Sequence, residues 1–121
     1  MMTLKNETVA VKQMIDRLHE LYLTTDGPVD KKDLGFFEKV KKETAPLFEL
    51  NNGWMEQAEI FVKNRGTRVH PNQVKSTHEN IEMLILHSYY LDIQRKRYKE
   101  LFQSSHYVLD MIIDDLNRAD D

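Results

Sequence analysis

Apolar residues recur at steps of three and four along almost the whole chain of 121 residues. Because an α-helix turns once every 3.6 residues, this spacing places them on one face of a helix. Four such series can be followed, and they begin at Leu4, Phe37, Val74 and Tyr98. Each apolar face must be buried against another, so the pattern predicts an all-α fold of four packed helices.

The first helix is expected to run from about Leu4 to Thr24, between Thr3 and the dipeptide Gly27-Pro28. The Thr3 hydroxyl suits the N-cap position, where a side-chain oxygen accepts a hydrogen bond from a free backbone N–H group. Gly accepts the left-handed conformation that follows a helix, and Pro cannot continue the ladder of backbone hydrogen bonds. The dipeptide therefore ends the first helix.

The second helix is expected to be the longest, although two helix breakers lie inside it. It opens near Asp30 or Asp33, whose carboxylates suit an N-cap, and it ends at Gly66. Pro46 and the run Asn51-Asn52-Gly53 interrupt it, yet the apolar face keeps its phase across both. An interior Pro removes one backbone hydrogen bond and costs about 3 kcal/mol or more unless the helix bends. We therefore expect either one long helix, kinked near Pro46 and Gly53, or two nearly coaxial helices that share a face.

Pro71 opens a third helix, because Pro is favoured at the first helical position. Neither Gly nor Pro follows it, and a single helix from there to the end of the chain would be on the order of 70 Å long, too long for a globule of this size. The chain must therefore reverse. We expect the turn in the polar stretch Asp92–Lys99, centred on Arg95-Lys96-Arg97, with Ser104-Ser105 as the alternative.

Four antiparallel helices with short connections form an up-and-down four-helix bundle. Residues 1–121 are expected to form one such domain, since a domain typically takes about 100–200 residues. This topology also predicts ion pairs of about 0–1 kcal/mol each at both ends of the bundle. The charged residues concerned are Asp26, Asp30 and Asp33 against the basic run 95–97 at one end, and Lys63, Arg65 and Arg68 against Asp114, Asp115, Asp120 and Asp121 at the other.

The composition argues against several classes of protein. The chain has no Cys, which excludes a disulfide framework and a thiolate metal site and fits a reducing compartment. Its 17 basic and 20 acidic residues give a formal charge of −3, whereas a surface that binds duplex nucleic acid needs a basic excess. No stretch approaches the ~18 apolar residues of a membrane span, and the N-terminus does not look like a signal peptide. We therefore expect a cytoplasmic protein with neither membrane nor nucleic acid as a partner.

A set of sequence fragments is distributed between Asp33 and Leu116. The fragments are Phe36-Phe37-Glu38, the single Trp54, Val69-His70 with Gln73-Val74, Leu84-x-Leu86-x-Ser88-Tyr89 and Arg95-Lys96-Arg97-Tyr98. With them the chain resembles the YppE-like family of small proteins from Bacillus-type bacteria. The resemblance implies a four-helix up-and-down bundle, in agreement with the periodicity. It implies no activity, because none is established for the family.

The histidines are the first candidates for chemistry, because bundle interiors can host metal ions between inward-facing carboxylates and histidines. Asp16 and His19 lie one helical turn apart, but they fall on the flank of the apolar face. With a turn near Arg95, His87 and His106 would be offset by roughly three residues, or ~4.5 Å along the bundle axis. They are the candidate ligands of a metal site completed by a carboxylate of another helix, and the alternative function that follows is a metal binder or a metal-dependent enzyme. The alternative is that each is an interfacial histidine with a hydrogen bond of its own and that no cofactor is bound.

The basic run Arg95-Lys96-Arg97 beside Tyr98 is the second candidate, since single-stranded nucleic acid is bound by cations and stacking aromatic rings. Against this alternative, Tyr98 belongs to an apolar face, and short charge runs are usually solvated surface. An accessory role in nucleic-acid binding therefore ranks below a solvated turn.

Trp54 is expected to be the largest anchor of the core, beside the weak point of the second helix; the alternative is that it lines a groove for a partner helix. The sequence contains no phosphate-binding loop, nucleophile elbow or His-Glu-x-x-His motif, so an enzyme is not expected. The leading interpretation is a non-enzymatic interaction or scaffold module that binds a protein partner or a second copy of itself. Its candidate contact residues are Trp54, Arg95, Lys96, Arg97 and Tyr98.

Overall fold

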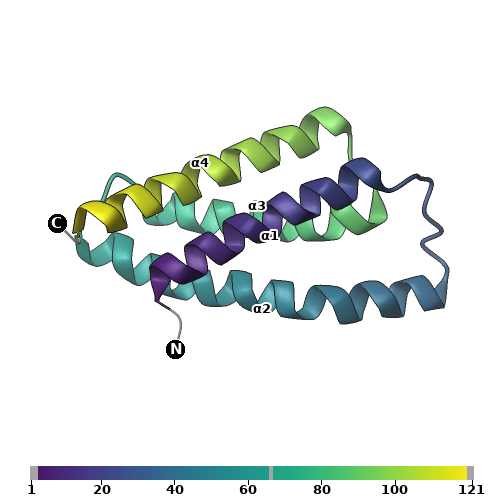
Figure 1. Ribbon diagram of the computed structural model, residues 1–121, viewed down its shortest axis with the longest axis horizontal. Coiled ribbons are helices and arrows are strands. Elements are labelled where there is room, and N and C mark those ends of the chain that lie inside the picture. The colour runs from purple at the N-terminus through teal and green to yellow at the C-terminus, as the bar shows by residue number, and fades with distance from the viewer. Residues whose placement is uncertain (1–2, 66, 120–121) are drawn as a thin grey trace.

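The computed structural model describes residues 3–65 and 67–119, and within them it contains four α-helices and no strand. The helices are α1 (Leu4–Thr24), α2 (Leu34–Arg65), α3 (Pro71–Tyr90) and α4 (Arg95–Ala119). Each helix runs antiparallel to the one before it, as Figure 1 shows. The prediction of an all-α, up-and-down four-helix bundle is confirmed.

Local capping explains where the first three helices begin. The Thr3 hydroxyl accepts a hydrogen bond from a backbone N–H of the first turn of α1 at 3.1 Å. Asp33 accepts two such bonds at the start of α2, at 2.9 and 3.2 Å. His70 and Gln73 form a reciprocal capping box ahead of Pro71. The predicted starts of the first and third helices are confirmed, and of the two candidate aspartates the later one caps the second helix.

α2 is one unbroken helix, so the single long helix is the correct alternative, while the kink itself stays a prediction. Pro46 lies exposed inside it and supplies no N–H to the carbonyl four residues earlier. Asn51 is buried and donates from its side-chain amide to the carbonyl of His78 in α3 at 3.0 Å. A Cβ on Gly53 would lie 2.9 Å from Oε2 of Glu7 in α1. Asn51 and Gly53 are therefore explained by contacts between helices rather than by a break.

The reversal between α3 and α4 lies earlier than predicted. Leu91 follows the last residue of α3 in the left-handed conformation (φ 57°, ψ 26°), and its N–H bonds to the carbonyl of His87. α4 begins at Arg95, so the connection comprises residues 91–94 and the basic run forms the first turn of α4. The connection thus overlaps only the start of the predicted stretch, and the alternative turn at Ser104-Ser105 is wrong because it lies inside α4. The turn was predicted at the most polar stretch of this region. It lies earlier because Leu91, and not the usual Gly, adopts the left-handed conformation that ends α3, and a Leu gives no such signal in the sequence.

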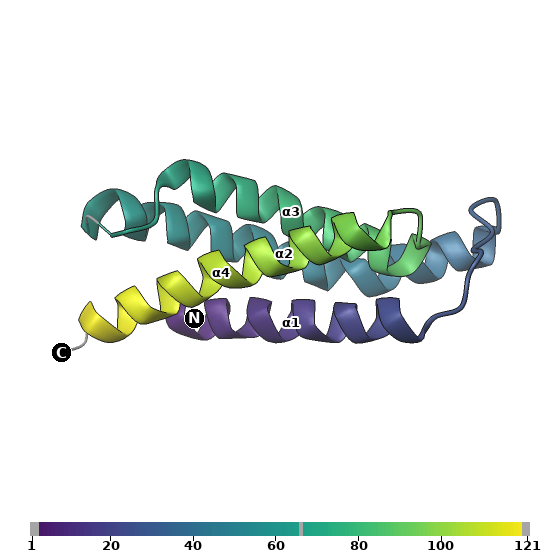
Figure 2. The ribbon, with the colours of Figure 1, turned by 90° about the horizontal axis from the view of Figure 1, so that it is seen from above.

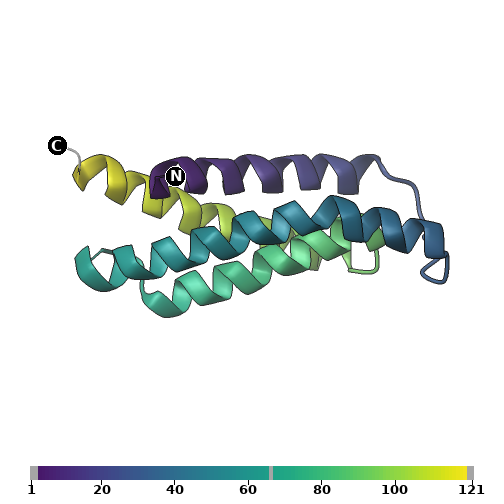
Figure 3. The same ribbon diagram turned by 90° about the horizontal axis from the view of Figure 1, so that it is seen from below.

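The bundle is not square in cross-section. α1 and α3 each pack against the other three helices, including each other, whereas α2 and α4 lie on opposite sides of that pair. In Figure 1, α4 and α2 accordingly form the upper and lower edges, with α1 and α3 between them. Figure 2 shows α4 passing obliquely over the bundle, and Figure 3 shows the long α2 extending past α1 at the end that carries their connection. With 32 residues, α2 is about 48 Å long, compared with about 32 Å for the 21 residues of α1.

The core is a continuous apolar cluster to which all four helices contribute, with Trp54 and Tyr98 as its largest fully buried side chains. The apolar face of α2 begins later than predicted, because Phe37 is 46% exposed whereas Val40 is buried. Gly66, which was expected to end the second helix, lies outside the described residues, and α2 ends at Arg65.

Candidate functional site

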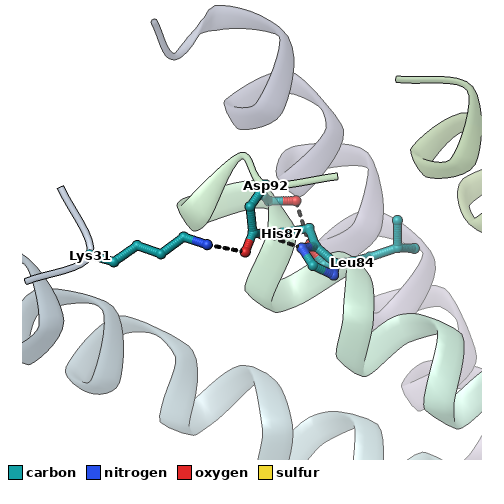
Figure 4. A network of polar contacts seen from close by, with 5 residues as sticks. Lys31, Leu84, His87 and Asp92 are labelled. Carbon is teal, nitrogen blue, oxygen red and sulfur yellow. Dashed lines mark hydrogen bonds and ion pairs between the residues drawn. The ribbon is translucent and has the colours of Figure 1, made fainter. Parts of the chain in front are cut away.

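Asp92 connects three segments at the end of the bundle where the α1–α2 and α3–α4 connections meet (Figure 4). Its carboxylate pairs with Lys31 Nζ at 2.5 Å and with His87 Nδ1 at 2.6 Å. The hydrogen bonds from Lys31 and His87 hold the pKa of Asp92 below its usual range. This contact fixes the α1–α2 connection to the end of α3, but the carboxylate is partly exposed, so solvent screens the pairs.

The ion pairs at the two ends follow the prediction only in part. Two of the aspartates expected to face the basic run, Asp30 and Asp33, instead accept hydrogen bonds from nearby backbone N–H groups. The ion pair between the two connections is Lys31 with Asp92, so the cation lies on the α1–α2 connection and the carboxylate on the α3–α4 connection, the reverse of the prediction. At the other end Arg68 pairs with Asp115 at 3.0 Å and with Asp114 at 3.9 Å, as predicted. Three of the predicted charges lie outside the described side chains: Arg65, Asp120 and Asp121.

His87 and His106, the candidate metal ligands, do not come together as expected. With the reversal at residues 91–94, they are offset by about eight residues, or ~12 Å along the axis, instead of three. His87 pairs with Asp92, and His106 Nε2 pairs with Asp16 Oδ1 of α1 at 2.6 Å. Within the described ranges, no group of three or more His, Cys, Asp or Glu side chains is arranged to hold a metal ion.

Trp54 and Tyr98 lie in the core and cannot contact a partner on the surface. Trp54 is 0% exposed, and its indole N–H donates to the hydroxyl of Thr8 at 3.1 Å. Tyr98 is 1% exposed and stacks on Tyr22, with 3.9 Å between the ring centroids. The prediction of Trp54 as a core anchor is confirmed. The prediction that these two residues contact a partner is wrong, because their large rings fill the interior.

The basic run at the start of α4 is exposed, as expected for a surface segment. Arg97 pairs with Glu100 of its own helix at 3.7 Å. Because Tyr98 is buried, however, Arg95, Lys96 and Arg97 lack the adjoining aromatic ring on which a base would stack. The structure therefore brings the three cations together but separates them from the tyrosine that suggested nucleic acid.

A groove lies between α1 and α2 at the end of the bundle that carries their connection, and α3 forms its floor. It consists of two adjoining hollows of about 360 and 110 Å³ that share Leu21, Glu43 and Tyr89. We call this feature the α1–α2 groove. Its lining residues are Met14, Arg17, Leu18, Leu21 and Thr25 on one wall, Phe36, Lys39, Glu43 and Leu47 on the other, and Ser88 and Tyr89 on the floor.

The groove exists because the two halves of α1 bind different helices. Near its N-terminus α1 is tied to α2, where Thr8 accepts the hydrogen bond of Trp54 and Glu7 accepts one from Gln57. Near its C-terminus it is held by α4, through the stacked rings of Tyr22 and Tyr98. In the view of Figure 1, α1 accordingly separates from α2 towards the connection. Side chains of α1 and α2 leave the groove open between these diverging segments.

The acidic and basic residues that line the groove differ in whether they have an interaction partner within the protein. The Tyr89 hydroxyl donates to Glu43 Oε1 at 3.1 Å, and burial together with this bond raises the pKa of Tyr89 to about 12. Arg17 and Lys39 are exposed on opposite walls, and neither makes an ion pair with another residue of the described chain. The single acidic residue of the lining is therefore engaged, while the two cations are not.

Sequence reasoning did not identify the groove. Lys39 and Glu43 stand directly before Val40 and Thr44 of the apolar face, where charged residues usually mark its solvated edge. Tyr89 appeared only as part of a family fragment. The sequence therefore marked the α2 wall of the groove, through these two charged residues at the edge of an apolar face. It did not show that α1 separates from α2, because that separation depends on tertiary contacts.

A family model described as a bacterial domain of unknown function, DUF1798, matches residues 8–116. The chain belongs to this family. The uncharacterized protein YppE of Bacillus subtilis is 31% identical to it over 96 residues, which are 78% of each chain, so the predicted YppE-like resemblance is confirmed.

Solved structures of similar proteins show the same bundle. The crystal structure of B. subtilis YppE matches with a TM-score of 0.84 at 27% identity, covering 97% of this chain and 94% of that one. A protein of unknown function from Listeria innocua matches in fold with a TM-score of 0.82 at 21% identity, covering 97% and 93% of the two chains. No helix in residues 3–65 and 67–119 is both long and apolar enough to cross a membrane.

Proposed function

We propose that this protein is a non-enzymatic, cytoplasmic interaction module and that the α1–α2 groove is the surface that binds its protein partner. The observation that carries the proposal is the groove itself: apolar side chains of three helices line it, with charged groups at its edges. Recognition grooves for partner helices combine these features. The cysteine-free composition supports the cytoplasmic location.

The chemistry of the groove supports binding rather than catalysis. A general acid or base works best with a pKa near the pH at which it operates. Tyr89 is the most buried titratable group of the lining, and its pKa of about 12 keeps the phenol protonated at neutral pH. Its hydroxyl is occupied by Glu43, so Tyr89 acts as part of the floor of the groove.

A charged substitution inside the groove tests this proposal. Leu21→Arg places a cation on the apolar wall, and Ile60→Arg is the matched control, because Ile60 is 62% exposed on α2 outside the groove lining. The tagged wild type and both variants are produced in the source organism, and their extracts are separated by size-exclusion chromatography. Purified protein, run alone at the same concentration, distinguishes a heterologous partner from a second copy.

We expect the wild type and Ile60→Arg to elute within a larger complex and Leu21→Arg to elute at the size of the free chain. Circular dichroism must show that Leu21→Arg keeps its helical content and cooperative melting. Elution of both variants like the wild type would contradict the groove as the binding surface. Elution of the wild type as the free chain in the extract would contradict the interaction module itself.

A further inference from the structure

The walls of the α1–α2 groove have the length and residue spacing of a binding site for an α-helix. On one wall the lining residues run from Met14 to Thr25, and on the other from Phe36 to Leu47, at steps of three and four. Each wall is therefore about 16 Å long. Two neighbouring helices with this spacing offer a row of holes that side chains of a third helix fill at positions i, i+4 and i+7. An occupant of matching shape is a helix of about three turns.

The floor of the groove favours an apolar face on that helix. Ser88 Oγ donates to the carbonyl of Leu84 at 2.5 Å and is paired with the Tyr98 hydroxyl at 2.6 Å. The Tyr89 hydroxyl donates to Glu43. These hydroxyl groups already have hydrogen-bond partners within the protein. A polar ligand would therefore give up hydrogen bonds to water on entering the groove, and the floor would not fully replace them. Apolar side chains have no such requirement.

The walls determine the charge of the occupant. Arg17 on one wall and Lys39 on the other are exposed and are not ion-paired with any residue of the described part of the chain. Glu43, the one acidic residue of the lining, is bound by Tyr89. A helix lying in the groove would bring the residues on both flanks of its apolar face towards these cations. Carboxylates on those flanks complete the pairs that the protein itself leaves open.

We propose that the partner presents an amphipathic α-helix with acidic residues on both flanks of its apolar face. This inference rests on the proposed function of the groove and specifies the chemistry of the occupant. The test uses two fluorescent synthetic peptides of about 18 residues, long enough to form a helix. They share one Leu- and Ala-rich apolar face, and one carries Glu and the other Lys at the flanking positions. Their binding to the full chain is measured by fluorescence anisotropy.

The acidic peptide is expected to bind about tenfold more tightly than the basic one, because its carboxylates form exposed ion pairs with both rim cations and the basic peptide forms none. Reversing both rim charges in the double variant Arg17→Glu/Lys39→Glu should invert the preference. The double variant Arg95→Glu/Arg97→Glu, which makes the same change of net charge outside the groove lining, should keep the wild-type preference. An equal response of the two double variants would show attraction by net charge alone and would overturn the inference.

Two further outcomes separate this inference from the proposed function. Equal binding of both peptides that is lost in Leu21→Arg would overturn the acidic flanks while keeping the groove as the binding surface. Binding of dodecanoate with no binding of either peptide would overturn the helical occupant in favour of an acyl chain. In both cases the size-exclusion comparison of Leu21→Arg with Ile60→Arg still decides independently whether the groove binds a protein.

Discussion

The hydrogen bond between Ser88 and Tyr98, under the floor of the groove, permits a sharp prediction. The Ser88 hydroxyl donates its one proton to the Leu84 carbonyl, so the Tyr98 hydroxyl must be the donor in the 2.6 Å contact with Ser88 Oγ. Tyr98→Phe removes this donor and leaves the Ser88 hydroxyl bonded to Leu84. The expected loss is about 1 kcal/mol of unfolding free energy.

Ser88→Ala should be the more damaging of the two changes, although each of them removes one hydroxyl oxygen. It leaves the Tyr98 hydroxyl, in a side chain that is 1% exposed, without its acceptor, which costs about 1–3 kcal/mol. In the double variant the unpaired hydroxyl is gone as well. We therefore expect the double variant to be no less stable than Ser88→Ala alone.

Thermal and urea unfolding followed by circular dichroism measure this cycle, at about 4 °C of Tm per kcal/mol for a domain of this size. Tyr107→Phe is the control, because Tyr107 is 65% exposed and the change should stay within about 0.5 kcal/mol. Additive losses in the double variant would refute the reasoning, since they would show that Ser88 and Tyr98 do not depend on one another.

Three further substitutions test other parts of the structure. Pro46→Ala should stabilise the protein by up to about 3 kcal/mol in urea unfolding, because it restores a donor inside an unbroken helix; destabilisation would show that the core needs a Pro-induced bend. Burial, followed by the charge of Glu56, raises the pKa of Glu7, so the associated stability is present below the unfolded-state value near 4.5 and is lost as the pH rises through the folded-state pKa. Glu7→Gln should remove that loss, which thermal melts from pH 4 to 7 would detect. The pKa of Asp92 is lowered, so its stabilisation is present above the unfolded-state value near 3.8 and is lost as the pH falls through the folded-state pKa. Asp92→Asn should therefore reduce the fall of Tm at acidic pH. An unchanged fall of Tm would count against the contact of Asp92 with Lys31 and His87.

The fold was predictable from sequence where its determinants are local. Thr3 and Pro71 mark helix starts through the chemistry of a single turn, and both starts are confirmed. The reversal at Leu91 was not predictable in this way, because Leu adopts the left-handed conformation only when contacts of the folded chain stabilise it. An error of a few residues there changed the expected distance between His87 and His106, since a displaced turn shifts two antiparallel helices by twice the displacement.

The candidate site was less predictable, because it depends on where helices separate. Periodicity shows which face of a helix is buried, but not which neighbour buries it. The alternative to Trp54 as a core anchor was a groove beside a weak point in α2, yet the contacts around Asn51 and Gly53 close α2 against its neighbours at that point. The opening lies nearer the start of α2, where the apolar face of α2 is bordered by Lys39 and Glu43.

The way in which α1 is held also determines how the groove can bind. One half of the helix is fixed to α2 through Thr8 and Trp54, and the other half is fixed to α4 through Tyr22 and Tyr98. Both walls and the floor are thus supported by contacts outside the groove, so the groove forms without an occupant. The groove therefore loses little conformational freedom when a partner helix binds, because folding has already ordered it. The conformational entropy lost on binding is mainly that of the partner. This division predicts that a peptide pre-organised as a helix gains more affinity than a longer flexible one with the same contacts.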